Sequence, residues 1–192
     1  AFLAAIWFVW ILNTAPLGDA PESLLNAFLI NGAFLGLFAD QHSIMARRWF
    51  KAGWTKIIPQ QIERSTYVLL ASLILLGMFY YWQPVPTVLW ETTQPVLYYG
   101  LLGLSGAGFL LVLFVTFLID HFELFGLTQV WNHWKGKSAA PPTFHTPSVY
   151  KWVRHPLYLG FTIAFVSTPR MTLDHLFFAI MTVGYMVVAI QF

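Results

Sequence analysis

The sequence predicts an all-α fold, a polytopic integral membrane helical bundle of about five spans plus a short helix that forms a C-terminal hairpin. Of the 192 residues, 58% are hydrophobic and 9% are charged, whereas soluble domains carry roughly 25% charged residues. The aromatic content of 18% suits the belts of Trp and Tyr that form at membrane interfaces. The apolar residues also gather into runs that approach the ~20 residues needed to cross a bilayer as a helix.

The expected spans follow from these apolar runs, taken in chain order. They cover residues 1–12, 24–39, 66–82, 97–119 and 173–192. Ser23 can cap the second helix at its start, and Gly32 and Gly36, four positions apart, predict close helix packing there. Residues 156–167 are too few to span alone. With a turn at 167–170, they are expected to form a hairpin with the last span.

The chain shows no internal repeat, so we expect residues 1–192 to form a single transmembrane domain. Residues 83–95 form a Pro-rich connection between the third and fourth spans. Both ends of the sequence lie inside apolar runs, and we therefore expect both ends to be trimmed.

Basic residues gather in two of the connections and predict the orientation. The loops after the second and fourth spans hold nine of them: Arg47, Arg48, Lys51, Lys56, Arg64, Lys135, Lys137, Lys151 and Arg154. The connections on the other face hold Arg170 alone. Because cytoplasmic loops are rich in Lys and Arg, both polar loops are expected in the cytoplasm, where together they can form one site.

Composition excludes several kinds of site. The sequence contains no Cys, which excludes disulfides, thiolate nucleophiles and Cys-based metal sites. His121 and the neighbouring acidic residues Asp120 and Glu123 are too loosely spaced to predict metal ligation, so no metal is predicted. The net charge of +2 does not point to nucleic acid. The ionisable residues cluster at span ends, which argues against a transporter or channel.

The most informative polar stretch is the one from Tyr150 to Gly160. Arg154 and His155 directly precede Pro156, which favours the first turn of a helix because it lacks an N–H group. They should therefore lie at the N-terminus of a helix, where unpaired N–H groups and the helix dipole suit a carboxylate. A basic flank at the lipid headgroups is the alternative. Tyr158 offers a ring face or a hydroxyl, and Gly160 lets a ligand or a helix approach the backbone.

Two further clusters stand at span ends. His42 and Arg47 follow the second span, where the alternative is a hydrated helix end with snorkelling arginines. Glu63 and Arg64 precede the third span. An acid there complements the helix dipole, but an adjacent ion pair beside hydrocarbon is costly and often functional.

Four of these motifs resemble those of a known superfamily of membrane enzymes. Arg154-His155-Pro156-Leu157-Tyr158-x-Gly160 resembles the signature of the isoprenylcysteine carboxyl methyltransferase superfamily, whose members are membrane enzymes that use S-adenosylmethionine. Three further motifs resemble its methanethiol S-methyltransferase branch, to which nurim is related: His42-Ser-x-Met-Ala-Arg47, Pro59-x-x-x-Glu63-Arg64-Ser65-Thr66-Tyr67-Val68 and His121-Phe-Glu-Leu-Phe-Gly126.

The resemblance implies transfer of a methyl group from S-adenosylmethionine to methanethiol, which yields dimethyl sulfide, in a bacterial inner membrane with the site facing the cytoplasm. The superfamily usually carries two acidic residues and a Tyr-rich tail after its last span. The sequence ends at Phe192 before such a segment, so part of the cofactor pocket is expected to be missing. A prenylcysteine carboxylate or a lipid as acceptor, or a nurim-like protein without catalysis, remain as alternatives.

A thiolate attacks far better than a thiol, so the enzyme is expected to deprotonate methanethiol and to hold it close to the methyl carbon. His42 is the expected base, oriented by Glu63, although the reverse assignment is equally consistent. Arg64 or Arg47 would stabilise the thiolate. The residues expected to bind the cofactor are Arg154, His155, Pro156, Tyr158, Gly160, His121 and, for stacking on adenine, Tyr150 or Trp152.

Overall fold

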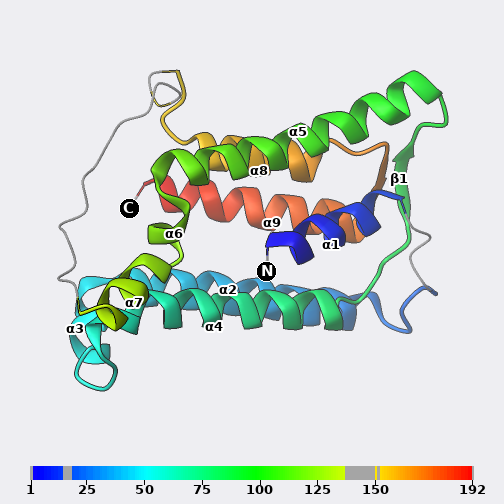
Figure 1. Cartoon of the computed structure of the whole chain (residues 1–192). Coiled ribbons are helices and arrows are strands. Elements are labelled where there is room, and N and C mark those ends of the chain that lie inside the picture. The colour runs from blue at the N-terminus through cyan, green and yellow to red at the C-terminus, as the bar shows by residue number, and fades with distance from the viewer. Residues whose placement is uncertain (1, 15–18, 137–149, 151, 192) are drawn as a thin grey trace.

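The computed structural model describes residues 2–14, 19–136, 150 and 152–191. Within these residues, helices that are long and apolar enough to cross a membrane are α2 (Leu24–Ala46), α4 (Gln60–Tyr81), α5 (Pro95–Ile119) and α9 (Leu173–Ile190). The shorter apolar helices α1 (Phe2–Thr14) and α8 (Pro156–Val166) lie alongside them (Figure 1). The predicted all-α membrane bundle is therefore confirmed, with α1 and α8 as elements shorter than a full span.

The connections form short helices at one end of the bundle and a two-stranded ribbon at the other. The short helices α3 (Arg48–Trp54), α6 (His121–Leu124) and α7 (Leu127–Trp134) lie at one end. At the other end, β1 (Val88–Glu91) pairs with β2 (Arg170–Thr172) as an antiparallel ribbon. The sequence predicted a Pro-rich connection and a turn at these places, and neither strand was predicted. The two short segments are far apart in sequence, and only the tertiary fold brings their backbones together.

Two helices extend further into the polar connections than expected. Helix α2 continues to Ala46 rather than residue 39, and α4 begins at Gln60 rather than residue 66. The cap at Ser23 is confirmed, because its hydroxyl accepts a hydrogen bond from Asn26 N at 3.3 Å. The predicted spans followed the apolar residues, whereas a helix can continue with polar residues beyond the hydrocarbon. The extension places His42 and Glu63 on regular helices.

Helices α5 and α8 pack so closely that only small residues fit between them. A Cβ atom added to Gly108 would lie 2.6 Å from both Ala164 N and Gly160 O. Ser105 Oγ donates a 2.7 Å hydrogen bond to the carbonyl of Ala164 across the same contact. The expected close contact at residues 32 and 36 is absent from the described residues, because the nearest atom to an added Cβ at Gly32 is a phenyl carbon at 3.6 Å.

The core is aromatic and surrounds α1. The ring of Phe8 stacks on Phe79 of α4 at 4.5 Å and meets Trp82 and Phe178 edge-on, both at 5.4 Å. Trp82 donates a 3.0 Å hydrogen bond from Nε1 to the fully buried carboxylate of Asp174, at the start of α9. The bundle is thus tied together near the ribbon end by apolar burial and by a hydrogen bond to one oxygen of a buried carboxylate.

Candidate active site

The polar connections meet at one end of the bundle. The C-terminal ends of α2 and α5 and the N-terminal ends of α4 and α8 all lie at the end opposite the ribbon, on the left in Figure 1. The sequence-based expectation that both polar loops share one face is therefore confirmed. Most of the predicted site residues, which the sequence scatters over more than a hundred positions, lie at this end.

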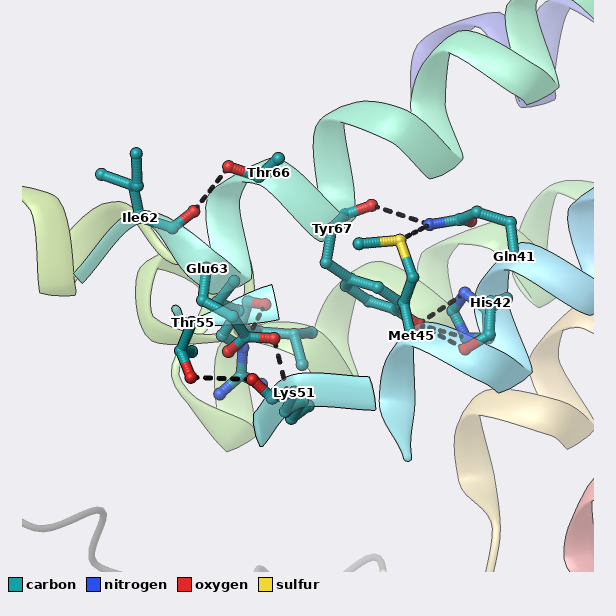
Figure 2. A network of polar contacts seen from close by, with 11 residues as sticks. Gln41, His42, Met45, Lys51, Thr55, Ile62, Glu63, Thr66 and Tyr67 are labelled. Atoms are coloured by element: carbon teal, nitrogen blue, oxygen red, sulfur yellow. Dashed lines mark hydrogen bonds and ion pairs between the residues drawn. The ribbon is translucent and has the colours of Figure 1, made fainter. Parts of the chain in front are cut away.

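His42 is oriented by a tyrosine. The hydroxyl of Tyr67 lies 2.7 Å from Nδ1 and 2.9 Å from Nε2 of His42, as Figure 2 shows. The imidazole also stacks on Phe38, one turn earlier in α2, at 5.4 Å. Glu63, the expected partner of His42, instead forms an ion pair with Lys51 of α3, with 3.7 Å between Nζ and Oε1.

The site extends from this pair to the last helix. Ser43 Oγ and the Tyr185 hydroxyl share a 2.9 Å hydrogen bond, which joins α2 to α9. The Tyr67 hydroxyl interacts electrostatically with Tyr185 and with Tyr158 of α8. Four helices therefore converge on one cluster of hydroxyl groups and the His42 imidazole. Sequence reasoning assigned no role to Ser43, Tyr67 or Tyr185, although a tyrosine inside an apolar span such as α9 is a usable signal.

Arg64 is held by the segment that links α6 to α7. Its Nε donates a 2.9 Å hydrogen bond to the carbonyl of Leu124, and Ser65 Oγ donates one of 2.9 Å to the carbonyl of Gly126. Arg64 and Glu63 also interact electrostatically with the Tyr67 hydroxyl. Arg64 therefore belongs to the same cluster as His42. Arg47 is exposed at the junction of α2 and α3.

The N-terminus of α8 has the structure that the sequence predicts. His155 is the N-cap and Pro156 is the first helical residue. Arg154 and His155 are both exposed, and the His155 ring stacks on Tyr158 at 5.6 Å with an interplanar angle of 16°. Two exposed donors beside free first-turn N–H groups fit a carboxylate. Tyr158 thus stacks on the N-cap residue of α8 and also interacts electrostatically with Tyr67.

The remaining expected cofactor residues differ in their surroundings. Trp152 is 89% exposed, so its indole face is accessible for stacking. Burial raises the pKa of the Tyr150 hydroxyl, which keeps it neutral. A Cβ added to Gly160 would lie 2.8 Å from Val112 Cγ2, so the close approach at Gly160 is made by helix α5.

His121 stands near the start of α8. Its Nδ1 lies 2.9 Å from the hydroxyl of Thr116, and its ring stacks on Phe117 at 4.5 Å. Because α5 and α8 run antiparallel, and Val112 packs on Gly160, Thr116 lies about one turn further, level with the start of α8. An open hollow of about 340 Å³, lined by residues 117–123, adjoins the imidazole. Within the described parts of the chain, no group of three His, Asp or Glu side chains could hold a metal ion.

Comparison with known proteins identifies the family. No family model and no solved structure matches the chain. Methanethiol S-methyltransferase 1 of Bradyrhizobium diazoefficiens is 54% identical over 168 residues, which cover 88% of this chain and 59% of the relative. Methanethiol S-methyltransferase of Mycobacterium tuberculosis is 48% identical over 178 residues, covering 93% and 70%. Nurim of Pan troglodytes is 32% identical over 177 residues, covering 86% and 66%.

The chain therefore spans between three fifths and three quarters of the length of the methyltransferases that it matches. The matched portion contains His42, Glu63, Arg64 and the start of α8 in one continuous bundle. At 48% identity over nearly its whole length to a relative of which it covers 70%, the chain belongs to the methanethiol S-methyltransferase family.

Proposed function

We propose that this protein is a membrane methyltransferase that transfers a methyl group from S-adenosylmethionine to methanethiol and releases dimethyl sulfide. We place it in a bacterial inner membrane with its site facing the cytoplasm, as the distribution of Lys and Arg indicates. The observation that carries the proposal is the Tyr67 hydroxyl, which lies within hydrogen-bonding distance of the His42 imidazole and interacts electrostatically with Tyr158 in the first turn of α8. The family relationship supplies the substrate class.

His42 is the base in this proposal. Alkyl thiols ionise well above neutral pH, so a neutral imidazole is required to take the proton. The thiol S–H bond would break and its proton would go to His42. The electron pair left on the thiol sulfur would form the new S–C bond to the methyl group, while the bond from that methyl group to the sulfonium sulfur would break and leave its electron pair there. The Tyr67 hydroxyl lies within hydrogen-bonding distance of both ring nitrogens and can accept a hydrogen bond from the protonated one. In this proposal the other nitrogen takes the thiol proton.

The charged residues Arg64 and Glu63 influence that step through their electrostatic interactions with the Tyr67 hydroxyl. Arg64 is fixed by its hydrogen bond to Leu124 and places a permanent positive charge near the Tyr67 hydroxyl. A cation at this position favours a thiolate over a thiol. Glu63 is paired with Lys51, which partly compensates its negative charge. Tyr67 thus takes the orienting role that the sequence alone assigned to Glu63.

The N-terminus of α8 is the proposed cofactor site. Arg154, His155 and the first-turn N–H groups would hold the carboxylate of S-adenosylmethionine, and Trp152 or Tyr150 would stack on its adenine. When bound, the cofactor supplies a methyl group on a positively charged sulfonium. Tyr158 stacks on His155 and interacts electrostatically with Tyr67, so it would border both substrates.

The test is a headspace assay for dimethyl sulfide with purified protein, methanethiol and S-adenosylmethionine. We expect His42→Ala to abolish turnover without weakening the binding of S-adenosylhomocysteine, measured by calorimetry. Tyr67→Phe should lower turnover and leave binding intact. His133→Ala, at an exposed position of α7, is the matched histidine control. If His42→Ala keeps near-full activity, the assignment of the base fails.

The similarity to Nurim keeps a non-catalytic membrane protein as the competing candidate. Such a scaffold would bind no S-adenosylhomocysteine, so the same calorimetry distinguishes the two. Turnover of a prenylcysteine or lipid acceptor in place of methanethiol would retain the cofactor site and reassign the acceptor.

A further inference from the structure

The apolar face of α7 points away from the protein and its polar face packs on the bundle, which is the reverse of a surface helix in a water-soluble protein. The apolar residues of α7 lie at Leu127 and at three, four and seven residues beyond it, in Val130, Trp131 and Trp134, and form an apolar arc about 100° wide. This arc points away from the protein: Leu127 is 53% exposed and Trp134 is 74% exposed.

The polar side of α7 faces the bundle instead. Thr128, Gln129 and Asn132 are partly buried, and Gln129 donates a 3.4 Å hydrogen bond to the carbonyl of Glu123. The helix is attached to α4 at its start, where the carbonyl of Gly126 accepts a hydrogen bond from Ser65. The orientation of the apolar arc is therefore imposed by contacts on the opposite side, and does not come from a free helix that could turn inward.

The surroundings of the arc identify what covers it. Helix α7 follows the end of the span α5 after the short helix α6, at the end of the bundle where the basic residues gather. Lys135 Nζ lies 4.5 Å from the centroid of the Trp131 ring, next to the apolar arc. Tryptophan and lysine side by side at a span end are typical of the headgroup region, where the ring lies at the interface and the ammonium reaches phosphate.

We propose that α7 lies in the phospholipid headgroup interface, with its apolar arc inserted among the lipids, and that it anchors the N-terminal end of α4 there. This anchor does not depend on which methyl acceptor the protein uses. It fits an amphipathic helix whose apolar face is buried at the boundary between headgroups and acyl chains. Through Leu124 and Gly126 it also fixes Arg64 and Ser65, so the lipid surface becomes part of the support of the candidate active site.

The absence of cysteine from the sequence permits a direct test. Single cysteines are introduced at Leu127 and Trp134 on the apolar arc and, as a matched control on the polar arc of the same helix, at His133. Each is spin-labelled in proteoliposomes of phosphatidylethanolamine and phosphatidylglycerol. Collision rates with oxygen, which concentrates in lipid, and with a water-soluble nickel chelate then report the surroundings. A cysteine at Phe114, exposed on the span α5, gives the lipid reference.

We expect oxygen collisions to dominate at the two arc positions, as at the α5 reference, and nickel collisions to dominate at the control. Dominant nickel collisions at Leu127 and Trp134 would place the arc in water and overturn the proposal. Exclusion of both reagents would show that protein covers the arc and would overturn it equally. If either label disturbs folding, Val130→Cys repeats the measurement on the same arc.

Discussion

A single methyl group added at Gly126, as in Gly126→Ala, should displace α7 from α4. Its φ angle of 77° lies in the left-handed region, and an added Cβ would lie 2.6 Å from Ser65 N. The obstructing atoms include backbone, so no side-chain rotation relieves the clash. Gly136, at a φ angle of 65°, has no described atom within 4 Å of the added Cβ. An alanine would be strained at either position because of the positive φ angle, but only at Gly126 would its Cβ also clash with neighbouring atoms.

The magnitudes follow from these two contributions. Alanine in the left-handed region costs about 1–2 kcal/mol, which applies to both Gly126→Ala and Gly136→Ala. Overpacking against a fixed backbone adds about 1–3 kcal/mol at Gly126 only. At roughly 2–4 °C per kcal/mol for a chain of this size, Gly126→Ala should unfold several degrees below Gly136→Ala in detergent, as followed by circular dichroism.

Activity adds a second measurement. Because Arg64 donates to the carbonyl of Leu124, two residues before Gly126, displacement of this segment should also reduce dimethyl sulfide production. Gly136→Ala should retain its activity. Equal unfolding temperatures and equal activities in the two variants would refute the close contact between Gly126 and α4 on which the reasoning rests.

Two further predictions concern the packing of the bundle. Gly160→Ala should destabilise the protein by about 1–3 kcal/mol, because the added Cβ would lie 2.8 Å from a side chain of α5. Gly103→Ala, on the same α5 but with no described atom within 4 Å, is the control in detergent unfolding, and a similar loss in both would contradict the prediction. Trp82→Phe should cost about 1–3 kcal/mol, because it removes a hydrogen bond from the buried Asp174 carboxylate. Trp90→Phe on exposed β1 should be nearly neutral, and matching unfolding midpoints for the two variants would disprove that role.

Much of the architecture could be predicted from the chain because the membrane imposes simple rules. Low charge and long apolar runs predict spanning helices, and the positions of the basic residues predict that both polar loops share one end. The start of α8 at Pro156 was predictable from the local preference of proline for a first helical turn, and the structure confirms it.

What the sequence determined by itself is thus the membrane class, the helices and the collection of polar motifs at one end. The tertiary structure decided the partners within that end. Only the packing of α2 on α4 shows that His42 meets Tyr67, and only the position of α3 shows that Glu63 pairs with Lys51. The sequence records which side chains are polar and how far apart they stand along one helix. It does not record the rotation of one helix against another, and that rotation decides which side chains touch.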